Sequence, residues 1–352
     1  MRKAWAAILA LLAFAIAPQA RADAVADFYK GKVVRIVVGF GPGGGYDAYA
    51  RLLSRHLGRH SPGNPSVVVQ NMPGAGTLRA ANFIYAAAPK DGTTIGTFSR
   101  DLPLLAMTGA SSSVAFDPRK FTWLGSSSSF ADDAYLLLVR SDSPAVSIEE
   151  ARRPGGPQLV LAGSNEGAPG NDVPMILRET ISLNVKVVSG YPDTAAMFLA
   201  MERGEVQGRT VDLSSVRTFR PQWLMPGGGM RALLQFARMT RHPDLSDVPT
   251  ARELASTESA RALIELTELP YFMARPFAAP PETPPDRAQA LEAAFIATHK
   301  DPQFLEDAAK LRLDVSPVGS AEILRTIDRI TTASPATLDH LRRLLAETKG
   351  GG

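Results

Sequence analysis

Residues 33–45 read VVRIVVGFGPGGG, in which the β-branched run Val33–Val38 leads directly into the glycine-rich loop 39–45. A run of this length and composition predicts a buried strand. Beyond the loop, apolar side chains recur at three- and four-residue spacing, which predicts an amphipathic helix that starts close to Asp47. The apolar positions are Tyr46, Ala50, Leu53 and Leu57. This stretch therefore predicts one strand–loop–helix unit.

The same unit recurs along the chain. Strands are predicted at Ser66–Val69, Thr94–Phe98, Leu159–Ala162 and Val185–Val188, and helices at Leu78–Ala87, Val173–Ser182 and Ala195–Arg203. Strands that alternate with helices through short, glycine-bearing loops are typical of an α/β sheet that contains parallel strands.

Two extended stretches, Tyr135–Val139 and Pro270–Ala278, separate two such sets of strands and helices. We therefore predict two α/β lobes joined by two extended crossings, with a ligand cleft between them. The chain leaves the first lobe, residues 23–134, for a second lobe over residues 135–264. It then returns, so that residues 265–352 complete the first lobe.

The chain has 352 residues, 45% hydrophobic and 21% charged, a length and composition typical of a globular protein of two domains. Its first 22 residues combine Arg2 and Lys3, an uncharged run of 14 residues, Ala4–Ala17, and the small residues Ala20 and Ala22. This pattern predicts a secretory signal peptide cleaved after Ala22, with a membrane anchor as the alternative. Cleavage brings the formal net charge from +3 to zero, so the basic balance does not indicate nucleic-acid binding.

Two glycine-bearing loops of the first lobe, 39–45 and 73–77, are candidates for a ligand site. The first matches the dinucleotide pattern G-x-G-x-x-G, but the ribose-binding acid is missing because the second strand ends in Gln70 and Asn71. A helix N-terminus carries unpaired N–H groups and partial positive charge, and successive glycines let the backbone fold round an anion. We therefore expect a carboxylate or a phosphate here, close to Phe40, Gly41, Gly43, Gly44, Gly45, Tyr46, Asp47, Gly74, Ala75, Gly76, Thr77 and Ser99. The alternatives are that the glycines serve backbone geometry only and that Asp47 is a helix N-cap.

Loops of the second lobe supply the other candidates, because α/β folds place ligands at the carboxyl ends of strands. These are Ser164, Gly190, Tyr191 and Thr194. Arg209 lies just past a short strand predicted at Glu205–Gly208, and it is either a carboxylate clamp or a solvated surface residue.

Motifs typical of catalysis are absent: the chain has no Walker A motif, no H-E-x-x-H, no G-x-S-x-G and no cysteine. His56 and His60 lie beside arginines, which indicates a solvated helix face rather than a metal site. We therefore expect neither metal nor cofactor. An enzyme, a secreted hydrolase or isomerase with Asp47, Asp172 or Asp212 as its base, is the alternative to a binding protein.

Six short motifs occur in order between Phe28 and Pro317, and each is weak alone. They are Gly41–Asp47, Asn71–Gly76, Ala88–Thr93, Gly190–Pro192, Gly204–Gly208 and Asp247–Thr250. Together they resemble the Bug, or tripartite tricarboxylate transporter, receptor family. The resemblance implies a periplasmic binding protein of the type II class, whose lobes close on a small organic acid and hand it to a membrane permease. A monomer suits such a shuttle. A sensory receptor that presents its ligand to a membrane kinase is a further reading.

The resemblance also implies how the ligand is held. In that family one carboxylate is bound mostly by backbone groups and ordered waters of the first two loops, and loops of the second lobe contact the other end. This chain departs from the family in loop 39–42, where many relatives have two prolines, and at Gln207, where aspartate is common. The distal part of the site is therefore expected to differ from that of receptors for the usual dicarboxylates.

Overall fold

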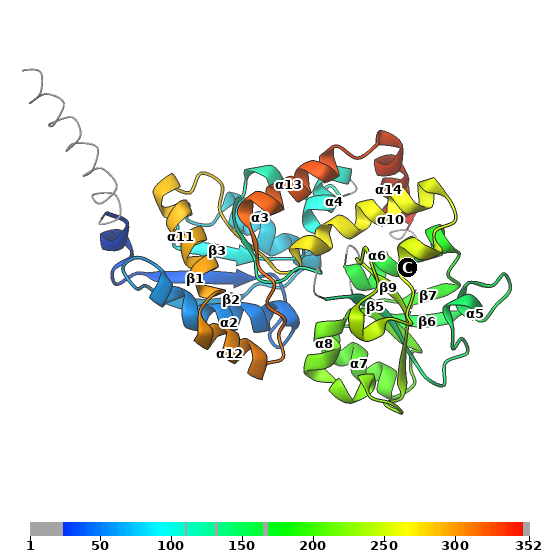
Figure 1. Cartoon of the computed structure of the whole chain (residues 1–352). Helices are drawn as coiled ribbons and strands as arrows, with labels where there is room; N and C mark the ends of the chain where they lie inside the picture. Colours follow the sequence, from blue (N-terminus) through cyan, green and yellow to red (C-terminus); the bar gives the residue numbers. More distant parts are fainter. Residues whose placement is uncertain (1–23, 110, 131–132, 165–167, 348–352) are drawn as a thin grey trace, which may run out of the picture.

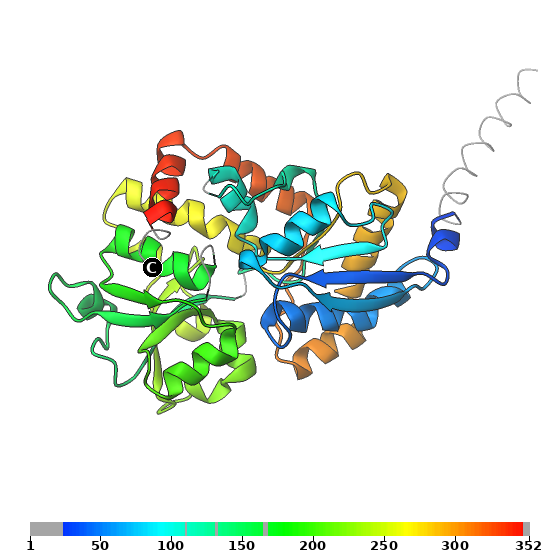
Figure 2. The same ribbon diagram turned by 180° about the vertical axis from the view of Figure 1, so that it is seen from behind.

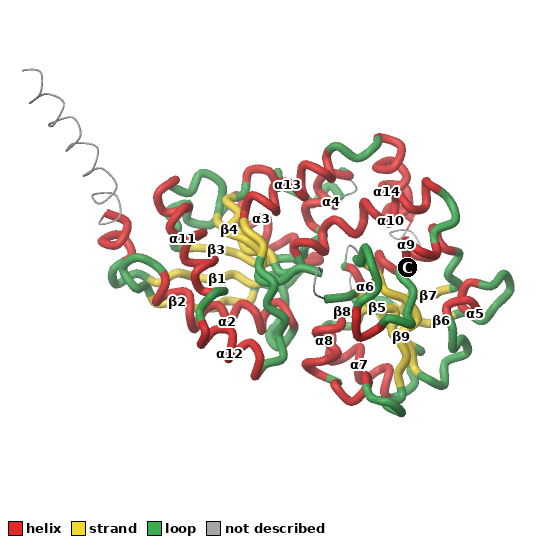
Figure 3. Tube along the Cα trace, viewed as in Figure 1, coloured by secondary structure: helices red, strands yellow, loops and turns green. Residues whose placement is uncertain are grey.

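The computed structural model describes residues 24–109, 111–130, 133–164 and 168–347, which form two α/β lobes side by side (Figure 1). Each lobe has a sheet at its centre and helices around it, as Figure 3 shows. The signal peptide predicted over residues 1–22 lies outside the described residues. In the part of the chain that is described, no helix is long and apolar enough to cross a membrane.

The sheet of the first lobe is mixed, with strand order β11-β4-β10-β3-β1-β2. β1 pairs in parallel with β2 and β3, whereas β10 is antiparallel to both β3 and β4. The strands are β1 (Val33–Val38), β2 (Ser66–Asn71), β3 (Thr94–Thr97), β4 (Thr122–Ser126), β10 (Pro276–Ala279) and β11 (Val318–Gly319).

Alternation of side chains along β1 divides the first core into two layers. Val34, Ile36 and Val38 are buried with apolar residues of one set of helices, and Val37 is buried with those of another. The first set is α2 (Gly45–His60), α11 (Pro285–Thr298) and α12 (Pro302–Lys310). The second set is α3 (Leu78–Ala86), α4 (Leu102–Thr108) and α13 (Ser320–Thr331).

The sheet of the second lobe has strand order β7-β6-β8-β5-β9, with β6 parallel to β7 and β8, and β5 antiparallel to β8 and β9. The strands are β5 (Tyr135–Arg140), β6 (Leu159–Ala162), β7 (Val185–Val188), β8 (Gly208–Asp212) and β9 (Met230–Phe236). One core of this lobe contains side chains of α6 (Pro169–Ile181) and α10 (Glu258–Glu268), and the other those of α7 (Thr194–Glu202) and α8 (Leu213–Phe219).

The chain passes between the sheets twice, and the two crossings are bonded to each other. The first lies between β4 and β5, and the second runs through the short 3₁₀ helix η5 (Leu269–Met273) to β10. The N–H of Phe130 donates to the carbonyl of Tyr271 at 3.1 Å, and the N–H of Ala274 donates to that of Ser128 at 3.0 Å. Residues 135–139, predicted as a crossing, are instead the strand β5, so the crossing lies just before them.

Two further expectations need correction. The C-terminal helix α14 (Pro335–Glu347) contacts α10 and α6 of the second lobe as well as α4 of the first, and Figure 2 shows it, in red, against the second lobe. The histidine face of α2 is not solvated: Nε2 of His56 lies 3.1 Å from the carboxylate of Asp307, and that of His60 lies 2.7 Å from Asp301. Both acids belong to the α12 region, which covers this face.

His299 at the end of α11 gives a prediction about pH. Its ring is buried, with Nδ1 2.7 Å from the carbonyl of Phe295 and Nε2 2.8 Å from the hydroxyl of Ser127. Burial lowers the pKa of His299 from 6.5 to about 4, although the carbonyl of Phe295 acts to raise it. Between pH 6.5 and 4 the unfolded chain therefore binds a proton that the folded protein excludes, so stability is lost as the pH falls through this range.

The titration of His299 is expected to lower the free energy of unfolding by roughly 3 kcal/mol by pH 4. Denaturant unfolding at pH 7 and pH 4.5 measures it. His299→Gln is expected to lose less stability than the wild type between these two pH values, because glutamine does not titrate. Equal losses in the two proteins would contradict the assignment.

Candidate functional site

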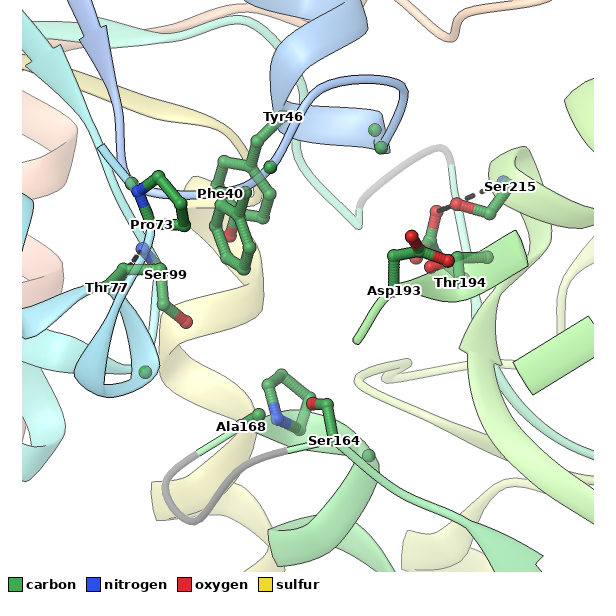
Figure 4. A pocket seen from close by; sticks show the side chains of 18 of the residues that line it. Phe40, Tyr46, Pro73, Thr77, Ser99, Ser164, Ala168, Asp193, Thr194 and Ser215 are labelled. Carbon is green, nitrogen blue, oxygen red and sulfur yellow. Dashed lines mark hydrogen bonds between the residues drawn. The ribbon is translucent and has the colours of Figure 1, made fainter. Parts of the chain in front are cut away.

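A cavity of about 190 Å³ lies where the two lobes face each other. Figure 4 shows Phe40, Tyr46 and Ser99 on its first-lobe side, with Asp193 and Thr194 opposite and Ser164 nearby. The lining residues come from the loops after β1, β2, β3, β6 and β7, from β8 and α8, and from the second crossing. The cavity therefore collects the carboxyl ends of strands from both sheets, where α/β folds place ligands.

The loop after β1 reaches the cavity through Gly41, Gly44 and Gly45, and through a stacked aromatic pair. The rings of Phe40 and Tyr46 lie 4.3 Å apart with an interplanar angle of 23°. α2 begins at Gly45, and a Cβ on Gly44, its N-cap residue, would meet no atom within 4 Å. The first loop thus presents backbone and one aromatic face to the cavity.

Asp47 holds this loop in shape and does not line the cavity. Its carboxylate is buried and accepts hydrogen bonds from the N–H of Gly43 at 2.9 Å, Nε of Arg51 at 2.8 Å and Nδ2 of Asn71 at 2.8 Å. Burial acts to raise the pKa of Asp47, but the bonds from Arg51, Gly43 and Asn71 outweigh it and hold the pKa below its usual value. Asp47 is therefore an ionised structural group that ties α2 to β2.

The loops after β2 and β3 meet on the same side. Gly74, Gly76 and Thr77 line the cavity, and the hydroxyl of Thr77 accepts a hydrogen bond from the N–H of Ser99 at 3.0 Å. Gly74 has φ +139°, a conformation that side-chain-bearing residues rarely adopt. Ala75 of the loop after β2, and Gly43 of the loop after β1, are not among the lining residues.

Of the four loop residues predicted in the second lobe, two line the cavity and two do not. Ser164 and Thr194 line the cavity. Gly190 and Tyr191 do not, and instead join the two loops behind it: the N–H of Gly190 donates to the carbonyl of Ser164 at 2.8 Å, and that of Tyr191 donates to Gly163 at 3.2 Å. Pro192 and Asp193 reach the cavity in their place.

Arg209 is buried in β8 and lines the cavity, which excludes the solvated alternative. Its Nε donates to the carbonyl of Thr210 at 3.1 Å, its guanidinium lies 5.3 Å from the centre of the Phe198 ring, and its Nη1 has no hydrogen-bond partner. The strand that carries it runs over Gly208–Asp212 and not over Glu205–Gly208 as predicted, so Arg209 lies within a strand rather than after one.

The sequence analysis missed two buried arginines that line the cavity, Arg100 and Arg275, and it named a third lining residue, Asp212, only as a possible base. Arg275 lies in the second crossing, and its Nη2 donates to the carboxylate of Asp212 at 3.1 Å. Burial acts to raise the pKa of Asp212, but Arg275 and the hydroxyl of Ser215 hold it well below its usual value. The sequence offered one indication that Arg100 belongs to the site, its position directly after the predicted site residue Ser99. It offered none for Arg275, because no motif spacing marks an isolated arginine in an apolar stretch as a site residue.

The lining of the cavity carries three arginines, Arg100, Arg209 and Arg275, and two aspartates, Asp193 and Asp212. Of the three carboxylates considered as bases, only Asp212 lines the cavity, and its low pKa and its bond to Arg275 make it a poor proton acceptor. Among the described residues, no three His, Cys, Asp or Glu side chains are grouped so that they could hold a metal ion. The lining instead offers guanidinium groups, hydroxyl groups and glycine-rich backbone.

Comparison with known proteins gives consistent results. The family model described as "Tripartite tricarboxylate transporter family receptor" matches residues 51–336. A UPF0065 protein of Bordetella pertussis is 28% identical over 294 residues, 82% of each chain. The periplasmic binding protein BugD is 20% identical with a TM-score of 0.65 over 90% of this chain and 98% of its own. An R. palustris protein solved with adipate is 22% identical with a TM-score of 0.66 over 89% and 97%.

Proposed function

This chain belongs to the tripartite tricarboxylate transporter receptor family, and from that premise we propose that its two lobes close on a small organic acid for delivery to a membrane permease. Members of the family are receptors and not enzymes. The observation that carries the ligand class is the set of three buried arginines, Arg100, Arg209 and Arg275, around one cavity. Buried guanidinium groups require negatively charged partners. Among the described residues, two carboxylates line the cavity, Asp193 and Asp212, and Asp212 is the one that forms an ion pair with one of these arginines.

Two further observations support this proposal. The amide-rich loops 40–45 and 74–77 lie on the first-lobe side of the same cavity, and backbone N–H groups at a helix start favour an acidic group. The structurally similar R. palustris protein was solved with adipate, a dicarboxylate. We place the ligand between the loops of both lobes, and we assign the receptor to the periplasm with cleavage after Ala22.

A binding screen of the mature protein, residues 23–352, tests the proposal. We expect a thermal shift of several degrees with one class of organic acid, a dissociation constant in the micromolar range or below by calorimetry, and recovery of the compound unchanged. Amino acids without a second acid group, nicotinamide derivatives and sugars are the comparison compounds. Failure of every organic acid to bind, or recovery of a changed compound, would refute the receptor function.

Gly44→Val tests the position of the ligand. A Cβ at Gly44 meets no protein atom within 4 Å and the residue lines the cavity, so valine is expected to fill ligand space without disturbing the fold. We expect affinity to fall about tenfold or more, since a displaced ligand loses its amide contacts.

Gly319→Val is a matched control for Gly44→Val. Gly319 is the N-cap residue of α13 with φ −81° and ψ 171°, close to the −87° and 172° of Gly44, and it lies outside the cavity. Both variants are expected to melt near the wild-type temperature, and only Gly44→Val is expected to lose affinity. Unchanged affinity in Gly44→Val would place the ligand elsewhere.

A further inference from the structure

Two carboxyl groups meet at one serine hydroxyl behind the cavity. Oγ of Ser214 lies 2.8 Å from Oδ2 of Asp133 and 3.0 Å from Oδ2 of Asp212. A serine hydroxyl carries one proton, so it donates to only one of these oxygens and meets the other as an acceptor. Both contacts are therefore hydrogen bonds only when one of the two carboxyl groups is protonated and donates to Ser214.

Asp212 is the ionised member of this pair. Its Oδ2 also accepts hydrogen bonds from the N–H of Ser215 at 3.0 Å, from the hydroxyl of Ser215, and from Nη2 of Arg275 at 3.1 Å. A guanidinium and several N–H and O–H donors stabilise the charged form of a carboxyl group. The shared proton therefore belongs to Asp133.

The contacts of Asp133 are those of a neutral carboxyl group. Asp133 is 4% exposed, and its Oδ1 accepts hydrogen bonds from the N–H of Ala134 at 2.8 Å and of Ser214 at 3.2 Å. Oδ2 faces the hydroxyl of Ser214, so it is placed to carry the proton. Within the described ranges, no Lys, Arg or His nitrogen lies within 4.0 Å of this carboxyl group.

The charged groups that act most strongly on Asp133 are acidic. They are Asp212 at the end of β8 and Asp314 in the segment between α12 and β11. Burial, and then the charges of these two acids, raise the pKa of Asp133 from 3.8 to about 7, although its own hydrogen bonds act to lower it. Tyr49 of α2 faces the same cluster, and burial raises the pKa of its hydroxyl, so it remains neutral.

The nearby cations bind other groups. Nη1 of Arg238 donates to the backbone carbonyl of Asp133 at 3.2 Å, and not to its carboxyl group. Arg275 and Arg100 instead lower the pKa of Asp212. Asp133 thus lies in the first crossing with its backbone tied to the second lobe, and its carboxyl group has no cation to hold it ionised.

Arg275 connects this pair of acids to the cavity. Arg275 and Asp212 both line the cavity, whereas Asp133 lies behind it. Nε of Arg275 is buried and has no hydrogen-bond partner among the described residues, so it is available to an anion in the cavity. Such an anion shares the cation that Asp212 uses and adds negative charge close to Asp133, which strengthens the binding of a proton there.

We propose that Asp133 is a proton-binding site coupled to the cavity, and that an organic acid bound beside Arg275 takes up a proton there. The coupling rests on the proposed function, whereas the proton shared with Ser214 does not. Binding of the anion and of the proton strengthen each other, because linkage is reciprocal. The affinity of the receptor therefore increases as the pH falls through the range in which Asp133 titrates.

Asp133→Asn tests the shared proton without any ligand. Asparagine keeps one acceptor oxygen for the two N–H groups and directs a donor to Ser214, as the protonated carboxyl group does. The wild type gains stability by binding a proton as the pH falls from 8 to 5.5, because the folded protein binds it more tightly than the unfolded chain, and the variant does not. We expect the melting temperature of Asp133→Asn, relative to wild type, to be higher at pH 8 than at pH 5.5 by about 3 °C or more.

Asp27→Asn makes the same chemical change at an exposed position outside the cavity and is the control. Its difference from the wild type is expected to be equal at the two pH values. A difference for Asp133→Asn that does not change with pH would overturn the shared proton. Carbon-13 NMR of aspartate carboxyl groups in the wild type gives a second measurement if the variant does not fold, and the absence of any that titrates between pH 6 and 8 would overturn it equally.

Calorimetry with adipate, which is doubly ionised at pH 7.5, tests the coupling. Titrations in phosphate and in Tris, two buffers of different ionisation enthalpy, give the number of protons taken up, and we expect about half a proton per adipate for the wild type and none for Asp133→Asn. The wild-type affinity is expected to increase about threefold or more from pH 8 to pH 6.5. That of Asp133→Asn is expected to stay constant and to exceed the wild-type value at pH 8.

The outcomes separate this inference from the receptor function. Malate is the second probe, and the acid identified by the binding screen replaces both if neither binds. Failure of every organic acid to bind the wild type refutes the receptor function and the coupling with it, while the melting comparison still decides the shared proton. Binding without proton uptake refutes the coupling and leaves the receptor function standing.

Discussion

Replacing Arg275 by methionine is expected to destabilise the protein by about 3–5 kcal/mol, because it leaves a buried carboxylate without its cation. In the wild type, Nη2 of Arg275 donates to Asp212 at 3.1 Å and Nη1 donates to the carbonyl of Ala274 at 3.0 Å. The first bond joins the second crossing to the start of α8. Methionine keeps much of the apolar length of arginine but supplies neither charge nor donor. Asp212 then lacks its ion-pair partner beside the acidic Asp133, and Arg100 remains as a weaker stabilising charge.

The pH dependence of the Arg275→Met variant distinguishes this cause from a general packing defect. Without Arg275 the pKa of Asp212 is expected to rise, since burial then acts unopposed by its main cation. A raised pKa in the folded state means that stability increases as the pH falls, because the folded variant binds a proton more tightly than the unfolded chain. The deficit measured by urea unfolding is therefore expected to be larger at pH 7.5 than at pH 4.5.

A double variant completes the comparison. Arg275→Met with Asp212→Asn removes both charges and is expected to recover part of the lost stability, because asparagine keeps acceptor capacity for Ser214 and Ser215 without a charge. Ligand binding is expected to be weakened in both variants. A wild-type unfolding free energy in Arg275→Met at pH 7.5 would contradict the role assigned to this ion pair.

Local patterns were sufficient to predict most of the first-lobe site. The valine run of β1, the glycine loop after it and the helix beginning beside Asp47 all lie within about 30 residues, so strand and helix periodicity describe them directly. β6 and β7 were predicted with the bounds that the structure shows. The two extended stretches between the sets of strands and helices predicted the two-lobe arrangement, and the family resemblance, confirmed by the match over residues 51–336, implied the same fold.

Arg100 and Arg275 were harder to predict than Arg209 because their roles depend on contacts between distant segments. Arg100 lies against Phe130 and Tyr271, which belong to the two crossings, and against Tyr135, the first residue of β5. Nothing in its local sequence marks it as buried, since arginine is mostly an exposed residue. For Asp47 the prediction was wrong in the opposite direction. Its position beside the glycine loop indicated a contact with the ligand, but its carboxylate oxygens instead accept hydrogen bonds from Arg51 and Asn71.

The second large loss of stability is expected for Gly208→Ala. Gly208 is the residue at which the predicted strand, Glu205–Gly208, ends and the observed strand β8 begins. β8 begins at Gly208 and pairs antiparallel with β5, opposite Val139. An added Cβ would lie 2.3 Å from the carbonyl oxygen of Leu138 and 2.9 Å from Cα of Val139, which are backbone atoms of a central strand and cannot move independently. We expect a loss of about 3 kcal/mol or more, at the upper end of overpacking effects.

The defect in Gly208→Ala is expected to extend to binding, because the next residue, Arg209, depends on β8 for its position in the cavity. Affinity for the organic acid identified in the binding screen should therefore fall even under conditions where the variant remains folded, as a displaced strand moves the guanidinium away from its ligand. Gly319→Ala is the control, since its Cβ meets no atom within 4 Å and it lies outside the cavity. A Gly208→Ala protein that melts and binds like Gly319→Ala would show that β5 and β8 can separate enough to admit a methyl group. The tight pairing that places Arg209 would then not be required for the site.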